Sequence, residues 1–293
     1  MAISDYPSVV TLPEAEPPYP SILEFLSMTF PNVTRHRWAE RILEGKVLDE
    51  KGNPITTDTA YTPGKRIFYF RETENEPVIP FAETILFQND ELLVADKPHY
   101  LPVTPGGRFV NECLLNRLRR RAGITDLAPV HRIDRETAGV VIFSVNKNTR
   151  GLYHGLFMHG KVEKTYHARA EVNRPPQETQ WIVENRIVRG EPRFRMITVP
   201  GIANSRSHIQ LLEVKGNRGQ FQLQPLTGKT HQLRLHMSGL GFKIVNDRVY
   251  PDLQPESGDD FDQPLQLLAK RVRFHDPVSG KDLEFRSERE LLW

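Results

Sequence analysis

The sequence predicts an α+β protein whose main part is a mixed, largely antiparallel sheet, preceded by a small α+β module. Many short alternating or apolar runs, separated by Gly and Pro turns, indicate strands, while helical periodicity is confined to a few segments. Helical and strand patterns also occur together near the start of the chain, and an acidic, proline-bearing stretch separates them from the remainder.

The composition is that of a globular protein long enough for a sizeable core, with 293 residues of which 38% are hydrophobic. The formal net charge is +2, so a nucleic-acid-binding surface would have to be a local patch. Cys113 is the only cysteine, which excludes an internal disulfide and a cysteine-rich metal site. No apolar run approaches the roughly 18 residues that span a membrane, and no signal pattern opens the chain. We therefore expect a cytoplasmic protein with no membrane association.

Residues 1–20 are rich in proline and poor in apolar side chains, so we expect an extended N-terminal arm without regular structure. Apolar residues at helical spacing predict a first helix capped by Ser21 and a second from Thr34 to Leu43, followed by short strands. We assign residues 21–71 to one small domain. Basic residues on its second helix and the next turn favour nucleic-acid binding, although a solvated helix face has the same composition: Arg35, Arg37, Arg41 and Lys46.

Residues 72–82 have the composition of an acidic linker, and residues 83–293 form the main domain. That domain begins with a predicted hairpin over residues 84–95. An amphipathic helix is predicted over residues 110–121, and its four arginines suit either a phosphate-binding edge or an ordinary charged surface. An acidic surface insertion is expected over residues 251–264, with Glu256, Asp259, Asp260 and Asp262.

The stretch from Pro129 to Gly139 combines ionisable residues with a following apolar run, Val140–Phe143, that predicts a strand buried on both faces. Two cations, Arg132 and Arg135, flank Asp134 in the sequence and would stabilise its charged form, which would suit a nucleophile at neutral pH. An ordinary surface ion pair, contributing less than about 1 kcal/mol, would have the same composition. The residues alone leave both interpretations open.

Three other motifs fail on spacing. A protein-kinase catalytic loop needs contiguous His-Arg-Asp, but Ile133 intervenes. A phosphate-binding loop would suit Gly228–Thr230, but Leu223 stands where its first glycine is required. A zinc site fails because His231 and His236 are five residues apart and would face different sides of a helix.

The segment His131–Gly139 resembles the signature His-Arg-Leu-Asp-Arg-x-Thr-Ser-Gly of the RluA-type pseudouridine synthases, which isomerise uridine within RNA. Its two conservative departures, at Ile133 and Ala138, leave the aspartate and its arginine neighbours intact. The other blocks of the family occur in the expected order, so the resemblance covers about residues 84–289: Asp96–Gly107, Lys164–Tyr166 and Leu226–Arg234.

This resemblance implies a central catalytic cleft with Asp134 as the catalytic carboxylate. The ring of Tyr166 would lie against the target uracil, and Arg234 would form the ion pair that orients the carboxylate. Thr230 is expected to cap the helix that carries Arg234. Substrate binding is expected of four further residues, among which Arg132 would fill the gap left by an extruded uridine: Arg132, Lys97, Leu235 and Lys229.

Residues 21–71 likewise resemble the αL RNA-binding motif found in many RNA-modifying enzymes. The family resemblance implies no metal and no other cofactor, an RNA partner that is rRNA or tRNA, and we expect a monomer. A non-catalytic RNA-binding or RNA-chaperone protein on the same fold is the alternative. A nuclease or methyltransferase would need metal-binding carboxylates or a glycine-rich cofactor loop, which the sequence lacks. The sequence does not determine which RNA or uridine is modified, nor which carbon Asp134 attacks.

Overall fold

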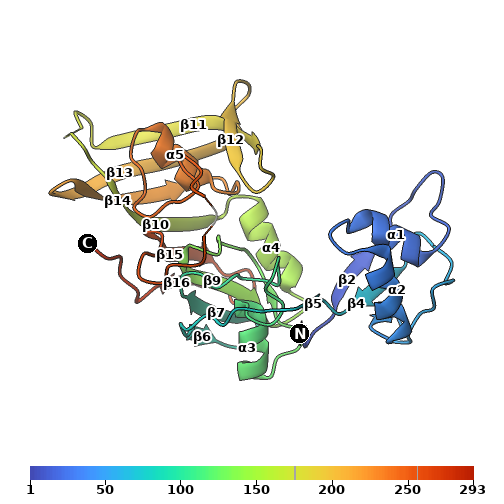
Figure 1. Cartoon of the computed structure of the whole chain (residues 1–293). Helices are drawn as coiled ribbons and strands as arrows, with labels where there is room; N and C mark the ends of the chain where they lie inside the picture. Colours follow the sequence, from blue (N-terminus) through green and yellow to red (C-terminus); the bar gives the residue numbers. More distant parts are fainter. Residues whose placement is uncertain (175, 256) are drawn as a thin grey trace. The chain divides into compact units, whose positions relative to one another are not determined.

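The computed structural model describes residues 1–174, 176–255 and 257–293, so Glu256 of the predicted acidic insertion lies outside the described residues. The chain divides into two compact units, and Figure 1 shows the elements of each. We call them the small unit (Met1–Pro77 with Gly106–Asn111) and the large unit (Val78–Pro105 with Glu112–Trp293).

In the small unit, helices α1 (Ile22–Thr29) and α2 (Arg35–Leu43) share a hydrophobic core with a sheet in the order β2–β4–β3. The hydroxyls of Ser21 and Thr34 accept hydrogen bonds from the first turns of these helices, which confirms both predicted helix starts. The strands of the small unit are β1 (Ala2–Ile3), β2 (Ser8–Thr11), β3 (Val47–Leu48), β4 (Arg66–Tyr69) and β5 (Glu72–Thr73).

The prediction of an arm without regular structure over residues 1–20 was wrong. Strand β2 pairs antiparallel with β4, and β1 pairs with β5. Leu12, which directly follows β2, is buried in the core of the small unit. Backbone pairing with distant strands, which proline content does not exclude at a sheet edge, gives this segment its structure.

The large unit is built on a sheet of eleven strands among the described residues, in the order β12–β11–β13–β14–β10–β15–β9–β7–β6, with β16 beside β15 and β8 beside β9. Of these described strands, only β15 and β9 run parallel to each other; the other pairs are antiparallel, as predicted for a mixed, largely antiparallel sheet. The strands are β6 (Thr84–Gln88), β7 (Leu92–Lys97), β8 (Ala128–Pro129), β9 (Ala138–Ser144), β10 (Val162–Glu171), β11 (Gln180–Arg189), β12 (Met196–Val199), β13 (Ser205–Lys215), β14 (Arg218–Pro225), β15 (Leu267–His275) and β16 (Asp282–Arg286).

Among the residues that the structure describes, three helices accompany this sheet: α3 (Leu114–Ala122), α4 (Arg150–Met158) and α5 (Gln232–Gly239). Helix α5 lies beside β12, β13 and β14 (Figure 1). The side chains of α5 that face the sheet join a core that includes Phe221, Leu223 and Met237. In the part of the chain that the structure describes, no helix combines the length and the apolar character that a membrane crossing needs.

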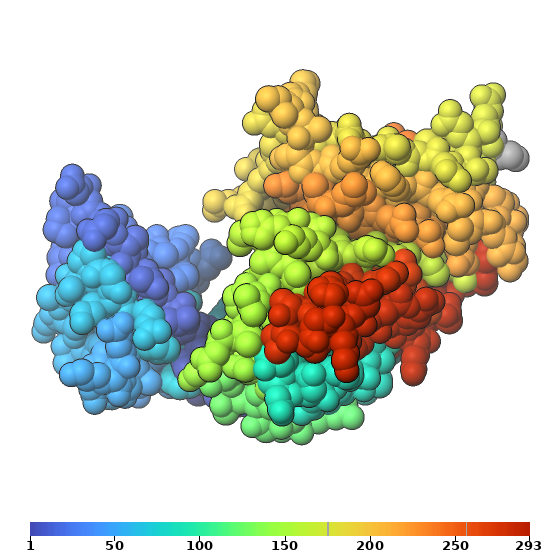
Figure 2. Space-filling view, turned by 180° about the vertical axis from the view of Figure 1, so that it is seen from behind, coloured from blue at the N-terminus to red at the C-terminus, as the bar shows by residue number. Residues whose placement is uncertain are grey.

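Strand β9 is buried along its whole length, which confirms the predicted strand with two covered faces. It starts at a point of close backbone approach, because Gly139 pairs with Ala269 of β15. A Cβ atom at Gly139 would lie 2.2 Å from the Ala269 carbonyl oxygen, and its φ of +116° is also unfavourable for other residues. Figure 2 shows the C-terminal strands (red) beside the strands of residues 84–97 (turquoise), and Ser287 hydrogen-bonds Asp96 there.

Candidate active site

The loop that carries Asp134 lies between β8 and β9, and its backbone is fastened from outside the loop. The N–H of Thr137 donates to the carbonyl of Asp134, which closes a turn. The ammonium group of Lys97 donates to the Arg135 carbonyl at 2.9 Å, and His99 Nδ1–H donates to the Glu136 carbonyl at 2.6 Å. The position of Asp134 is therefore set by residues from the end of β7 and the loop after it.

His131 supports the same loop as a buried, neutral side chain. Its ring stacks on Phe157 of α4, with centroids 4.5 Å apart, and its Nε2 accepts a hydrogen bond from the Ile142 N–H. Burial lowers the pKa of His131 to about 3, with a smaller contribution from Lys164. His131 thus holds the loop against the sheet and carries no charge near neutral pH.

The nitrogen groups nearest Asp134 come from α5 and its start, a hundred residues further along the chain. Arg234 Nη1 lies 3.6 Å and His231 Nε2 lies 3.9 Å from Asp134 Oδ2. The Asp134 side chain is 25% exposed. Among the described residues, no hydrogen bond or ion pair is found to Oδ1, so that oxygen is free to meet a substrate.

The prediction that Arg132 and Arg135 are the cations beside Asp134 was wrong. Arg135 forms a two-pronged pair with Asp259, at 2.8 and 2.9 Å, and also contacts Glu136. Arg132 is exposed. Adjacent residues in a turn point in different directions, so neighbours in the sequence need not be partners in space.

Arg234 is buried and held by a second carboxylate. Its Nε and Nη2 donate to Asp247 at 2.7 and 2.6 Å. Burial opposes its charge, but the hydrogen bonds and negative charge of Asp247, together with that of Asp134, outweigh burial and raise the pKa of Arg234. The guanidinium is thus a permanent, rigid cation directed at Asp134.

Tyr166 lies on β10 with its ring packed against the hydrophobic core beside the sheet. Burial, and secondarily the charge of Asp134, raises the pKa of Tyr166 well above its usual value. The phenol therefore keeps its proton and can act as a hydrogen-bond donor near the carboxylate. The structure thus brings together the three residues that the resemblance makes catalytic: Asp134, Tyr166 and Arg234.

The structure does not support the predicted contact of Lys97 with substrate. Its side chain is fully buried, and besides the Arg135 carbonyl it donates to the carbonyls of Pro98 and Leu101, at 2.9 and 2.7 Å. Burial lowers the pKa of Lys97 to about 7, against the attraction of Glu136 and Asp134. All three donor positions of the ammonium have acceptors, so Lys97 supports the loop and leaves substrate contact to other groups.

The other predicted substrate-binding residues are accessible. Arg132 and Lys229 are exposed, and Leu235 on α5 is half-buried. The predicted cap of α5 by Thr230 was wrong, since His231 is the residue before the helix and has a left-handed φ of +54°. The side chain of Gln232 accepts from the Lys229 N–H at 3.0 Å and tightens the turn in its place.

His231 was missed as a site residue by sequence reasoning, which weighed it only as a zinc ligand. Its position between Lys229 and Arg234 in the third block was the available signal. The described residues contain no group of three or more His, Cys, Asp and Glu side chains placed to hold a metal ion.

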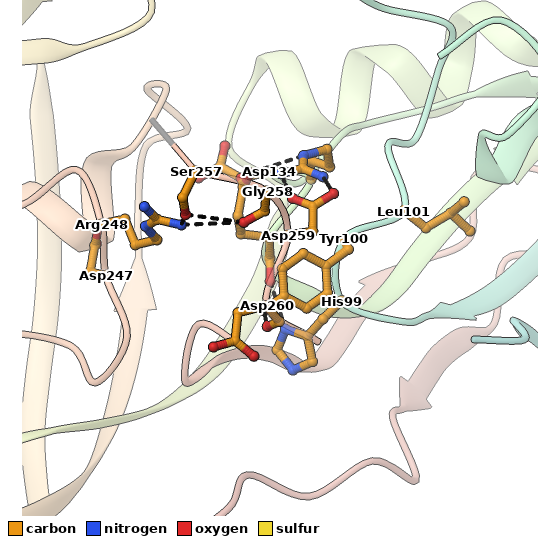
Figure 3. Close-up of polar contacts among 12 residues, drawn as sticks. His99, Tyr100, Leu101, Asp134, Asp247, Arg248, Ser257, Gly258, Asp259 and Asp260 are labelled. Carbon is orange, nitrogen blue, oxygen red and sulfur yellow. Dashed lines mark hydrogen bonds and ion pairs between the residues drawn. The ribbon is translucent and has the colours of Figure 1, made fainter. Parts of the chain in front are cut away.

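The acidic insertion lies against the loop that carries Asp134 (Figure 3). Besides the Asp259–Arg135 pair, the Tyr100 hydroxyl donates to the Asp260 carbonyl, and Arg248 donates to the Pro255 carbonyl at 2.7 Å. The ring of Phe261 packs edge-on against those of Tyr100 and Phe81. The insertion is therefore fastened at its described positions by charge, hydrogen bonds and ring contacts.

Comparisons with known proteins agree with the mixed sheet of the large unit. A family model described as RNA pseudouridylate synthase matches residues 91–239. The human pseudouridylate synthase RPUSD2 is 30% identical over 181 residues, 59% of this chain and 32% of that protein. The dual-specificity RNA pseudouridine synthase RluA of Haemophilus influenzae is 28% identical over 227 residues, 74% of this chain and 97% of the relative.

Among solved structures, the human RNA Pseudouridylate Synthase Domain Containing 1 matches with a TM-score of 0.59 at 24% identity, over 73% of this chain and 86% of that one. That likeness supports the fold. The class follows from the family model, which spans 149 of the 293 residues and describes RNA-modifying enzymes. The chain belongs to the RNA pseudouridylate synthase family.

Proposed function

We propose that this protein isomerises specific uridines to pseudouridine in structured RNA, with Asp134 as its catalytic carboxylate. The supporting observation is the asymmetric setting of that side chain: both nearby partners, Arg234 and His231, approach Oδ2. Oδ1 is left for the substrate. The buried, paired Arg234 keeps the carboxylate oriented without covering it.

The reaction needs three changes at the nucleoside. The bond between the anomeric carbon and N1 breaks, the base rotates, and a bond forms from the anomeric carbon to C5. The proton then leaves C5, and N1 ends with a proton. Asp134 would attack either the base or the sugar, or stabilise a sugar cation, and the protonated phenol of Tyr166 would stack on the base and assist proton movement.

For the substrate we propose rRNA or tRNA, bound in the cytoplasm by a monomer. Exposed Arg132 and Lys229 would contact RNA, and half-buried Leu235 would form a wall against the base. Extrusion of a uridine from folded RNA leaves a gap that the long side chain of Arg132 would fill. The reaction as proposed uses no metal or other cofactor.

We propose that residues 21–71 act as an αL-type RNA-binding domain. Its basic residues are engaged in the free protein: Arg37, Arg41 and Lys46 contact Glu72, and Arg35 contacts Glu24. RNA contact through them would therefore exchange carboxylate partners for phosphates. Charge-removing variants of Arg35 should weaken RNA affinity while leaving the rate at saturating RNA unchanged.

The test is carbodiimide-based pseudouridine mapping of total RNA from cells with and without the gene, with wild-type and Asp134→Ala rescue alongside. A site that disappears on deletion and returns only with the wild-type protein would support the proposal and identify the target. A site that returns with Asp134→Ala would refute Asp134 as catalyst. Equal RNA binding and cellular effect of both proteins, with no changed site, would favour the non-catalytic RNA-binding alternative.

A further inference from the structure

His231 connects Asp134 to a hydroxyl group behind it. His231 Nε2 lies 3.9 Å from Asp134 Oδ2, and His231 Nδ1 lies 2.9 Å from the Tyr250 hydroxyl. The two rings also meet edge to face, with centroids 5.6 Å apart. The imidazole is therefore fixed in orientation on the side away from the carboxylate.

The hydrogen bonds of Tyr250 indicate which nitrogen of His231 carries the proton. The N–H of Met196 donates to the Tyr250 hydroxyl at 2.8 Å, which occupies an acceptor position of that oxygen. The hydroxyl proton can then go to His231 Nδ1, at 2.9 Å, or to the Met196 carbonyl, at 3.1 Å. The contact to His231 is the shorter. A neutral imidazole that accepts at Nδ1 has its N–H at Nε2, the nitrogen that faces Asp134.

The surroundings favour this neutral form. Burial lowers the pKa of His231, and Asp134 only partly opposes this. Other groups whose charge acts on the ring are Arg234, Glu136 and Asp247. His231 is thus suited to orient a carboxylate by donating one hydrogen bond, with Arg234 as the permanent cation.

Both partners of Asp134 depend on one short segment of chain. Asp247 binds the Arg234 guanidinium and also accepts from the backbone N–H of Val249 and Tyr250, at 2.9 and 3.1 Å. Tyr250 in turn holds His231. The segment 247–250 therefore positions the cation and the donor together.

We propose that His231 is a positioning residue for Asp134, donating from Nε2 to Oδ2, and that Tyr250 sets its tautomer. The inference rests on the proposed function. A distance of 3.9 Å exceeds a hydrogen bond, so the donor engages as the carboxylate turns toward bound RNA. With His231 and Arg234 both on Oδ2, the carboxylate presents Oδ1 in one direction.

The experiment measures single-turnover pseudouridine formation and RNA affinity of the full chain against pH, using the RNA identified by the mapping. For His231→Ala we expect a rate about 30-fold lower, as for loss of a hydrogen bond to a charged group, with an RNA Kd within about 2-fold of wild type. The acidic limb of its pH–rate profile should move to higher pH, because the carboxylate loses a stabilising donor.

Three further variants separate positioning from packing. Gln at position 231 places an N–H near the site of Nε2, so His231→Gln should recover part of the rate. Tyr250→Phe should lower the rate about 5-fold, and the double variant Tyr250→Phe with His231→Ala should be no slower than His231→Ala, because Tyr250 acts through His231. The matched control is His236→Gln, which changes a buried histidine on the same helix that pairs with Ser205 and Asn185, and it should keep the rate within about 2-fold.

Thermal unfolding of each variant establishes that it is folded. A folded His231→Ala with wild-type rate and pH profile would overturn the inference while leaving the proposed function intact. Independent, multiplying losses from His231→Ala and Tyr250→Phe would overturn the role of Tyr250. A wild-type protein that binds RNA and forms no pseudouridine would overturn the proposed function itself.

Discussion

Glu72 of the small unit and Asp134 of the large unit are both carboxylates facing cations, but they differ in how closely those cations approach. Glu72 is 2% exposed and contacts Arg37, Arg41 and Lys46 at 2.9, 2.9 and 2.5 Å. Asp134 is 25% exposed, and its nearest cationic group lies 3.6 Å away. Burial opposes the charge of Glu72, but Lys46 and Arg41 outweigh it and lower the pKa of Glu72.

The difference separates a structural carboxylate from one that is available for reaction. Close contacts on both oxygens of Glu72 use its lone pairs and fasten α2 to β5. Asp134 keeps one oxygen without a partner among the described residues. The hydrogen bonds of Arg234 go to Asp247, and Asp134 receives only its longer ion pair. A cluster of charges in a sequence therefore indicates function only when the folded structure leaves a charged atom without a hydrogen-bond partner.

A substitution of Asp134 is the most direct test of the difference between the two carboxylates. In Asp134→Asn the single-turnover rate should fall by about 10³-fold or more, because the reacting oxygen loses its charge. The free energy of unfolding should change by less than about 1 kcal/mol, since the pairs of Asp134 are long and partly solvated. Quench-flow kinetics and denaturant unfolding measure the two quantities. Asp90→Asn, at an exposed turn, is the control. A large loss of stability in Asp134→Asn would show that Asp134 is a structural carboxylate like Glu72.

Asp247 of the large unit resembles Glu72, because it forms a close, buried ion pair with Arg234. Asp247→Ala leaves the buried Arg234 guanidinium without its main partner, so the free energy of unfolding should fall by about 3–5 kcal/mol. Denaturant titration measures it, with Asp262→Ala on the exposed part of the insertion as control. An unchanged stability would mean that Arg234 can rely on Asp134 alone.

Glu72→Gln tests the structural role of the other carboxylate. Three cations lose a shared counter-charge, one of them largely buried, so we expect a local loss of about 2 kcal/mol in the small unit. Hydrogen exchange of the α2 and β5 amides should accelerate, while the rate at saturating RNA stays unchanged. Exposed Glu74→Gln is the matched control. A loss of catalytic rate in Glu72→Gln would contradict the division of roles.

The neutral histidines and the paired carboxylate Glu72 should both lose their contribution to stability as pH falls, because the folded-state pKa of each lies below its usual value. Burial lowers the pKa of His131 to about 3 and the pKa values of His99 and His236 to about 4. The unfolded chain takes up these protons near pH 6.5, so stability is full above that pH and is lost as pH falls toward about 4. Each histidine contributes about 1.4 kcal/mol per pH unit in that window.

Thermal unfolding between pH 7 and pH 4.5 checks this expectation. His131→Gln should flatten the dependence by one histidine's share. A melting temperature that rises on acidification would contradict the assignment of these side chains as neutral.

Much of the fold was predictable because local signals agreed with it. The hairpin of β6 and β7, the buried strand β9, the cap at Ser21 and the start of the second helix near Thr34 follow from periodicity and turn chemistry within a few residues. The β2 strand was missed because its partner, β4, lies more than fifty residues away in the sequence.

The motifs predicted the residue types of the proposed site, whereas the contacts that those residues make were predicted only in part. Motif resemblance identified Asp134, Tyr166 and Arg234, but adjacent Arg132 and Arg135 were taken as the charges around the carboxylate. Burial of Lys97 and the pairing of Arg135 with Asp259 are long-range properties that a local pattern does not contain. His231 was missed because its partners, Asp134 and Tyr250, meet it only in the folded chain.

The contact of Gly139 with Ala269 also has a consequence for synthesis of the protein. The loop of Asp134 rests on β15, a strand that leaves the ribosome some 130 residues after the loop itself. Every block of the signature motifs is made before that strand exists. A chain stopped after α5 would contain all the proposed catalytic residues and still lack the support that holds them in place, so a late nonsense mutation should abolish activity as completely as the loss of Asp134.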